Sequence, residues 1–214
     1  MQISFNKTLK LCAVFLTLSI IGILFIDKPL TIFMHQHYFD NYTQLRILTE
    51  FTPPAALFIT FIGVVIHYFK DKIKLVICFM YIYVGLEITL MLKTGLKIVA
   101  GRYWPKTWIN HNLSLIDNNV YGFNWLHGFG NQGSFPSGHS IYTAYCMTWF
   151  MLLMPKYRYL GIMICVIGIA PQIILDYHFF GDCMAGVSLG MITAVSLATI
   201  WQKHIEQRIP LKLT

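Results

Sequence analysis

The sequence predicts an all-α fold, a polytopic membrane bundle of six transmembrane helices. Of its 214 residues, 56% are hydrophobic and only 12% are charged, whereas a soluble globular domain carries about 25% charged residues. The apolar residues are gathered in long stretches that approach or reach the roughly 20 residues needed to cross a bilayer. The alternative is the core of a large soluble protein, but too few charged residues remain to cover its surface.

The first predicted span, 11–26, contains no charged residue and follows Lys7 and Lys10. A basic flank before an apolar run is also typical of a cleaved secretory signal peptide. The exit of the span, 24–28, reads Leu-Phe-Ile-Asp-Lys and lacks the small residues that a signal peptidase requires. We therefore expect this helix to be retained.

Five further apolar stretches follow in order along the chain. They are 51–69, 75–92, 140–155, 159–175 and 183–202. Only one of them is interrupted by a charged residue, Glu87. Because an ionisable group inside a span is costly, we expect Glu87 to have a hydrogen-bonded structural role.

Basic residues are distributed unequally between the two sides of the predicted bundle. With six spans, both termini lie on one side, and that side collects most of the basic flanking residues. They are Lys7, Lys10, Lys70, Lys72, Lys74, Lys156, Arg158, Lys203, Arg208 and Lys212. The more basic side is cytoplasmic under the positive-inside rule. We therefore predict a protein of the bacterial inner membrane whose other side faces the periplasm or the exterior.

The chain is predicted to form a single domain, 1–214, with long external loops at 27–50 and 101–135. Loops of this length are usually functional, and the aromatic residues of the second fit either an interfacial anchor or a lid over a lipid headgroup. The net charge of +7 comes mostly from cytoplasmic flanks that suit anionic membrane lipids, so no nucleic-acid partner is expected. The five cysteines show no metal-ligand spacing.

Three short segments on the external side carry residues suited to phosphate chemistry. The first, 97–105, contains Lys97 and Arg102, two cations on the less basic side of the bundle. We expect both to neutralise phosphate oxygens and the charge that develops in a transition state. A basic collar at the end of a helix is the simpler interpretation.

The second segment, 135–140, places Ser137, Gly138 and His139 at the start of the fourth span. Ser137 is a favourable N-cap, and the start of a helix offers free N–H groups that bind phosphate. We expect Ser137 and Gly138 to contribute to phosphate binding, and His139 to protonate a departing oxygen. The alternative is a capped helix start with an interfacial histidine.

The third segment, 178–182, pairs His178 with Asp182. A spacing of four puts the two side chains on one face of a helix. A carboxylate bonded to one imidazole nitrogen fixes the tautomer and leaves the other nitrogen nucleophilic. By itself the pair is more typical of a histidine at a helix end and an acid at the next helix start, but its place beside the second segment favours catalysis.

Together the three segments resemble the type-2 phosphatidic acid phosphatase and haloperoxidase superfamily, in its integral-membrane lipid phosphatase branch. That family's pattern is Lys, six residues and Arg-Pro, then Pro-Ser-Gly-His, then Ser-Arg, five residues, His, three residues and Asp. The resemblance implies that His178 attacks phosphorus to form a phosphohistidine, that Asp182 orients it and that His139 protonates the leaving oxygen. It also implies a phosphorylated lipid substrate and no metal or cofactor.

Two positions depart from that pattern. Trp104 and Gln172 stand where the family has arginines that clamp phosphate, and a bidentate guanidinium is not easily replaced. Arg102, two residues before Trp104, is expected to reach the same oxygens. Further candidates to supply the missing charge are Lys93, Lys106 and His127.

The sequence therefore predicts a metal-independent phosphatase that hydrolyses a lipid phosphate or diphosphate at the outer membrane face. One alternative is a lipid-to-lipid phosphotransferase, in which a second lipid resolves the phosphohistidine. Another is a non-catalytic lipid-binding membrane protein that has lost turnover together with the arginines. Neither the lipid nor the oligomeric state follows from the sequence.

Overall fold

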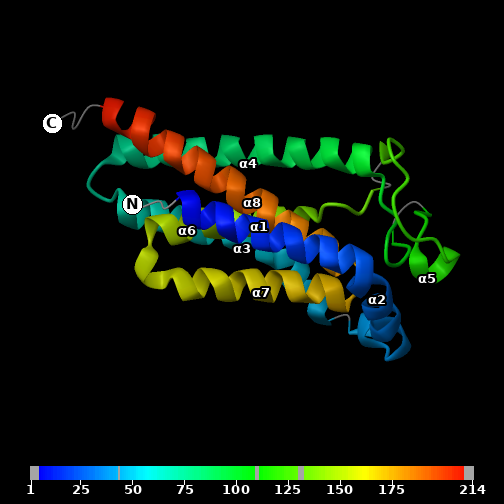
Figure 1. The fold of residues 1–214 in the computed structure, drawn as a ribbon. Helices are drawn as coiled ribbons and strands as arrows, with labels where there is room; N and C mark the ends of the chain where they lie inside the picture. The colour runs from blue at the N-terminus through cyan, green and yellow to red at the C-terminus, as the bar shows by residue number, and fades with distance from the viewer. Residues whose placement is uncertain (1–4, 43, 109–110, 130–132, 210–214) are drawn as a thin grey trace.

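The computed structural model describes residues 5–209, except 43, 109–110 and 130–132. Within these residues the fold is helical and contains no strand (Figure 1). Short π and 3-10 turns extend or join the α-helices. The helices are α1 (Phe5–Ile21), α2 (Asp27–Gln36), α3 (Gln44–His67), α4 (Lys72–Ala100), α5 (Leu115–Asn118), α6 (Gly138–Leu153), α7 (Arg158–Ile174) and α8 (Phe180–Ile200).

Five helical segments are long and apolar enough to cross a membrane, which supports the prediction of an integral membrane protein. They are α1 with α2, α3, α4, α7 with the turn before it, and α8 with its extension to Arg208. The remaining predicted span, 140–155, coincides with α6, whose 16 residues are fewer than the roughly 20 that span a bilayer. Most side chains of α6 are buried, and it packs against α3, α4, α7 and α8. Five of the six predicted spans therefore have the length of a membrane span.

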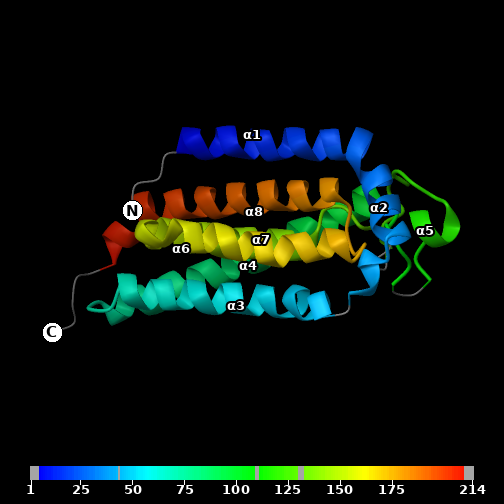
Figure 2. The same cartoon turned by 90° about the horizontal axis from the view of Figure 1, so that it is seen from below.

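The two ends of the bundle carry different parts of the chain (Figure 1). One end holds the start of α1, the end of α8 and the turns that join α3 to α4 and α6 to α7. The other end holds α2, α5 and the connections from α4 to α6 and from α7 to α8. All three motif segments lie at this second end, here called the outer end. Figure 2 shows α1 and α3 on opposite sides of the layer that contains α6, α7 and α8.

Close packing of α6 against α8 fixes the second and third motif segments relative to each other. A Cβ atom at Gly186 would lie 2.7 Å from the Ser137 carbonyl oxygen, and one at Gly190 would lie 2.5 Å from that of Ile141. Only glycine permits so close an approach of two helix backbones. At the outer end the Ser137 N–H donates to the Asp182 carbonyl at 3.1 Å, which ties the start of α6 to the first turn of α8.

The predicted external loop 27–50 is largely helical, because α2 continues from α1 and α3 begins at Gln44. In a regular α-helix, Pro29 would clash with the carbonyl four residues earlier. Here that carbonyl belongs to the wider π-turn Gly22–Ile26, and such turns often accommodate irregularities in a helix. The prediction of a loop was wrong for most of this segment.

The described residues of the connection 101–137 form a cap over the outer end. The Trp108 indole N–H donates to the Asp176 carbonyl at 3.1 Å, and the Tyr121 hydroxyl donates to the Ile23 carbonyl at 2.6 Å. Trp125 and Phe129 remain exposed on this cap. Exposed aromatic rings suit both an interfacial anchor and a lid, so both interpretations stay predictions.

Glu87 is exposed on α4, and its side chain makes no hydrogen bond to another described residue. The hydrogen-bonded structural role expected from the sequence is therefore not found within that part of the chain.

Candidate active site

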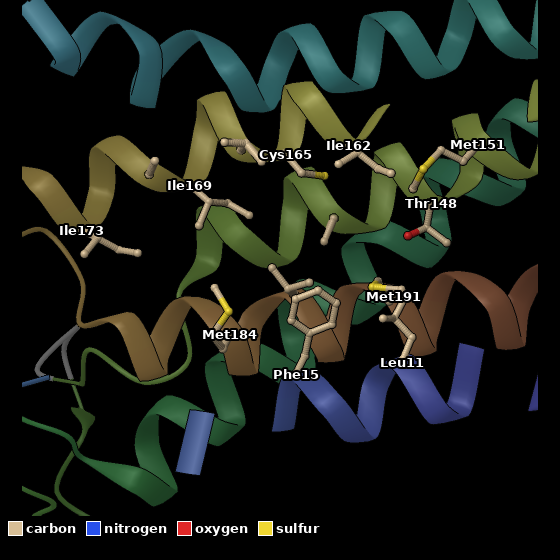
Figure 3. Close-up of a pocket in the computed structure, with 14 residues that line it drawn as sticks. Leu11, Phe15, Thr148, Met151, Ile162, Cys165, Ile169, Ile173, Met184 and Met191 are labelled. Carbon is tan, nitrogen blue, oxygen red and sulfur yellow. The ribbon is translucent and has the colours of Figure 1, made fainter. Parts of the chain in front are cut away.

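Two cavities in the protein differ sharply in their chemistry. The larger, of about 510 Å³, is a groove between α1, α6, α7 and α8. Figure 3 shows Phe15, Ile169 and Met184 turned into this groove, and Thr148 is the one lining residue with a side-chain oxygen. Its apolar lining offers no group suited to phosphoryl transfer.

The smaller cavity, of about 370 Å³, lies at the outer end and combines residues from all three motif segments. Its lining residues come from α3, α4, α6 and the loops before α5 and α8. They are Pro53, Leu90, Lys93, Lys97, Trp104, Gly138, His139, Tyr142 and His178. The structure thus brings together four of the seven site residues predicted from the sequence: Lys97, Gly138, His139 and His178.

His178 lies in the turn between α7 and α8, where the Gln172 carbonyl accepts its backbone N–H at 3.0 Å. Its Nδ1 is 3.6 Å from Asp182 Oδ2, which is longer than a direct hydrogen bond. Catalytic hydrogen bonds often tighten only when substrate binds. Because Nδ1 faces the carboxylate, Nε2 is the nitrogen available to a substrate in the cavity.

Asp182 is held rigidly at the first turn of α8. Its Oδ2 accepts the Phe179 N–H at 3.2 Å, and its Oδ1 accepts from Arg102 Nη1 at 2.5 Å. The side chain is fully buried. A carboxylate fixed at both oxygens can orient the His178 ring without reorganising during the reaction.

Arg102 lies between two buried carboxylates. Its Nη2 donates to Asp27 Oδ2 at 2.6 Å and to the Tyr121 hydroxyl at 3.1 Å, while Nη1 binds Asp182. Asp27 also accepts the Gly181 N–H at 2.8 Å, which joins α2 to the start of α8. These contacts bring together the first span, the cap and the last span.

This position of Arg102 does not suit the phosphate-binding role expected from the sequence. The side chain is 0% exposed, it is absent from the cavity lining, and its guanidinium is already bound by Asp27 and Asp182. A guanidinium so engaged holds the Asp182 carboxylate in place. Arg102 and Asp27 are therefore positioning residues for Asp182.

The cationic part of the cavity comes from α4. Lys93 and Lys97 both line it, four residues apart on one helix face. The Lys97 ammonium lies 4.8 Å from the centroid of the Trp104 ring, and the Trp104 and His178 ring centroids are 5.2 Å apart. Trp104 therefore packs against both His178 and the Lys97 ammonium.

The second motif segment caps α6 as predicted. Ser137 Oγ accepts the Ser140 N–H at 3.3 Å and donates to Gln172 Oε1 at 3.1 Å. Ser137 is fully buried and does not line the cavity, so its expected contact with phosphate is replaced here by a structural one. Gly138 and His139, the next residues of α6, do line the cavity.

The electrostatics of the site favour a neutral His178 and a charged Arg102. Burial lowers the pKa of His178 below 6.5, and the nearby Lys97 lowers it further, although Asp182 opposes both effects. Burial also acts to lower the pKa of Arg102, but the carboxylates of Asp182 and Asp27 outweigh it and raise that pKa. A neutral imidazole is the nucleophilic form.

A scan against models of protein families matches residues 74–206 to the PAP2 superfamily. The chain belongs to this family. A search of curated proteins found no match. Among solved structures, the PAP2 chain resembles a transmembrane PAP2-type phosphatidylglycerolphosphate phosphatase from Bacillus subtilis, with 17% identity over 96% of each chain and a TM-score of 0.43.

The two departures from the PAP2 pattern have different structural consequences. Trp104 lines the cavity and contacts His178. Gln172 is 1% exposed, and its amide N–H donates to the Gly168 carbonyl at 3.2 Å, so it braces the turn that carries His178. Neither residue contributes a positive charge to the cavity.

Of the three residues expected to compensate for the missing arginines, the structure places only Lys93 in the cavity. Lys106 lies over the Trp108 ring, 5.2 Å from its centroid. His127 is exposed, with Nδ1 2.6 Å from the Trp125 carbonyl oxygen.

Asp27 was not identified as a site residue from the sequence. In the sequence, Asp27 follows the first apolar stretch and stands at the start of the predicted loop 27–50.

Among the described residues, no three His, Cys, Asp or Glu side chains come together in a group that would hold a metal ion. The acids of the site are instead bound to Arg102. Within the described part of the chain, the positively charged side chains that line the cavity are Lys93 and Lys97.

Proposed function

We propose that this PAP2 protein is a lipid phosphatase that acts through a phosphohistidine, without a metal ion, at the outer face of the bacterial inner membrane. One observation carries the proposal. His178, whose Nδ1 faces the buried Asp182, lines the same cavity as Lys97 and His139 at one end of the membrane helices. A nucleophile, an acid and a cation thus share one space that a lipid headgroup can reach.

In the first half-reaction, Nε2 of neutral His178 attacks phosphorus, and the bond from phosphorus to the lipid oxygen breaks. His139 donates a proton to that oxygen, while Lys97 and the first N–H groups of α6 offset the charge on the phosphate. In the second, water attacks the phosphohistidine and gives a proton to His139. The N–P bond breaks, phosphate leaves and His178 returns to its neutral form.

The orientation follows from the charge on the two ends of the bundle. The turns 68–71 and 154–157, together with the start of α1 and the end of α8, lie opposite the cavity. Most of the basic flanking residues are in or next to these segments. The positive-inside rule assigns that basic end to the cytoplasm. The cavity then opens toward the periplasm.

The test is release of inorganic phosphate by the purified protein in detergent, with chelator present, from phosphatidic acid, phosphatidylglycerophosphate and polyprenyl diphosphate. We expect release by the wild type, and a loss of at least about 10³-fold in His178→Ala, because the nucleophile is removed. His204→Ala, a change near the other end of α8, is the matched control.

No release from any of these lipids by folded wild-type protein would contradict the proposal. Transfer of phosphate to a second lipid, detected by mass spectrometry in place of free phosphate, would replace hydrolysis by phosphotransfer. Equal activity of His178→Ala and wild type would exclude His178 as the nucleophile.

A further inference from the structure

Lys93 is a cation in the active-site cavity that the PAP2 pattern does not include. It lies one helical turn before Lys97 on α4, and both line the cavity. Among the described residues neither ammonium forms an ion pair with a carboxylate. Like charges at this spacing repel each other, so the pair is suited to an anion that binds between or beside both groups.

Lys93 and Lys97 lie at different depths in the bundle. The α-helix rises 1.5 Å per residue, so Lys93 is about 6 Å further from the outer end than Lys97. Lys97 is at the level of Trp104 and His178, near the outer end of α4. Leu90 lies deeper still in the same cavity, so the lining changes from cationic to apolar with depth.

The stem of Lys93 has a defined position. A Cβ atom added at Gly138 would lie 3.2 Å from Lys93 Cδ and 3.8 Å from its Nζ. The ammonium therefore lies beside the first residue of α6, next to His139, rather than extending to the surface. This is the side of the cavity from which a leaving group departs in the proposed reaction.

A lipid that enters with its chain toward Leu90 places its terminal phosphate at His178 and its next group beside Lys93. We infer that this group is a second phosphate, and that the site takes lipid diphosphates, with Lys97 on the transferred phosphate and Lys93 on the one that stays with the lipid. The inference rests on the proposed function and names its substrate class.

The chemistry of the leaving group supports this assignment. Cleavage of a lipid monophosphate expels an alkoxide, whose parent alcohol is about as weak an acid as water. Cleavage of a diphosphate expels a phosphate monoester, whose second pKa is about 6. A site with Trp104 and Gln172 in place of two arginines stabilises less charge in the transition state, so the better leaving group suits it.

The bond changes are as follows for a diphosphate. His178 Nε2 attacks the terminal phosphorus, and the bond from that phosphorus to the bridging oxygen breaks. The electron pair stays on the lipid monophosphate, where a proton from His139 and the charge of Lys93 offset it. Water then attacks the phosphohistidine, His139 accepts one proton, and inorganic phosphate leaves as the N–P bond breaks.

The experiment compares farnesyl diphosphate with farnesyl monophosphate in detergent micelles, measuring released phosphate and the lipid product. We expect wild type to prefer the diphosphate and to form farnesyl monophosphate first. Lys93→Met removes a charge-assisted contact, so we expect kcat/KM to fall about 10- to 100-fold on the diphosphate and markedly less on the monophosphate. Lys93→Arg should restore much of the loss, and Lys72→Met, at the opposite end of α4, is the matched control.

Equal losses on both lipids in Lys93→Met, or a wild type that does not prefer the diphosphate, would overturn the inference while leaving phosphatase activity established. Hydrolysis of neither lipid by folded protein would overturn the proposed function as well. Size-exclusion profiles and melting temperatures of each variant show whether a loss reflects unfolding.

Discussion

The active site has two halves that treat charge in opposite ways. In the closed half, Asp27, Arg102 and Asp182 are fully buried and bind one another at 2.5 and 2.6 Å. In the open half, Lys93 and Lys97 face a cavity and have no carboxylate partner among the described residues. The charge of Arg102 in the closed half is compensated by carboxylates of the protein itself. The two ammonium groups of the open half have no such counter-charge among the described residues, so an anion that binds in the cavity would supply it.

The one arginine of the first segment binds two buried carboxylates and does not line the cavity. Two buried carboxylates without a cation would be strongly unfavourable, since removing one partner of a buried pair costs about 3–5 kcal/mol. Arg102 offsets that cost and leaves the closed half with one net negative charge. In the proposed mechanism, that charge favours the positive charge that develops on His178 as it becomes phosphorylated.

Within the open half, the largest effect is expected from His139→Gln. General acids contribute about 10²- to 10⁴-fold, so kcat on a lipid monophosphate should fall within that range. The fall should be smaller on a diphosphate, whose leaving group needs less protonation. Steady-state rates on both lipids check this, and an equal loss on both would mean that His139 does not act on the leaving oxygen.

The closed half is tested by Arg102→Gln. The amide cannot hold both Asp27 and Asp182, so we expect kcat to fall about 10²-fold, as when a positioning group is misplaced, with a lowered melting temperature and little change in KM. Asp27→Asn, which keeps an acceptor for the Gly181 N–H, should lower kcat less. A raised KM at unchanged kcat would show instead that Arg102 contacts phosphate.

Lys97→Met tests the open half, where we expect a change in KM rather than in kcat and stability. Loss of a charge-assisted contact to phosphate should raise KM and the inhibition constant of vanadate by about 10- to 100-fold. The melting temperature should stay unchanged or rise, because Lys93 then lacks a like-charged neighbour. A lower melting temperature with an unchanged KM would show instead that Lys97 has a structural role, like the residues of the closed half.

The smallest effect concerns pH. Because burial and Lys97 hold the pKa of His178 below 6.5 against the opposing pull of Asp182, His178 stays neutral as the pH falls through 6.5. The acid limb of kcat/KM should therefore lie below pH 6.5. In Lys97→Met the imidazolium is less disfavoured, so the limb should move to higher pH. Arg102 and His139 also face this ring, and a limb above 6.5 in wild type would contradict the assignment.

Much of the fold and part of the site could be predicted from the sequence. Long uncharged stretches indicate membrane helices directly, because their composition has no other stable environment in a chain of this size. Local spacing also placed His139 at a helix start and His178 near Asp182. These features depend on residues close together in sequence.

Features that depend on distant contacts could not be predicted. Asp27 and Asp182 meet across Arg102 only because α1 packs along α8, and no local pattern reports that. Arg102 lies two residues before the position at which the family pattern has a phosphate-binding arginine. Its contacts are set instead by Asp27 and Asp182, which are distant from it in sequence. The helix α2 was likewise not predicted, because Pro29 normally ends a helix. The π-turn that accommodates Pro29 cannot be predicted from the residue pattern.

The most direct test of the account is to trap the phosphoenzyme. Wild type and His178→Ala are mixed with a lipid substrate labelled with ³²P at its terminal phosphate, quenched in base and analysed by peptide mass spectrometry. We expect a base-stable, acid-labile phosphate on His178 in wild type and none in the variant. Label on another residue, or turnover by His178→Ala without label, would contradict the account.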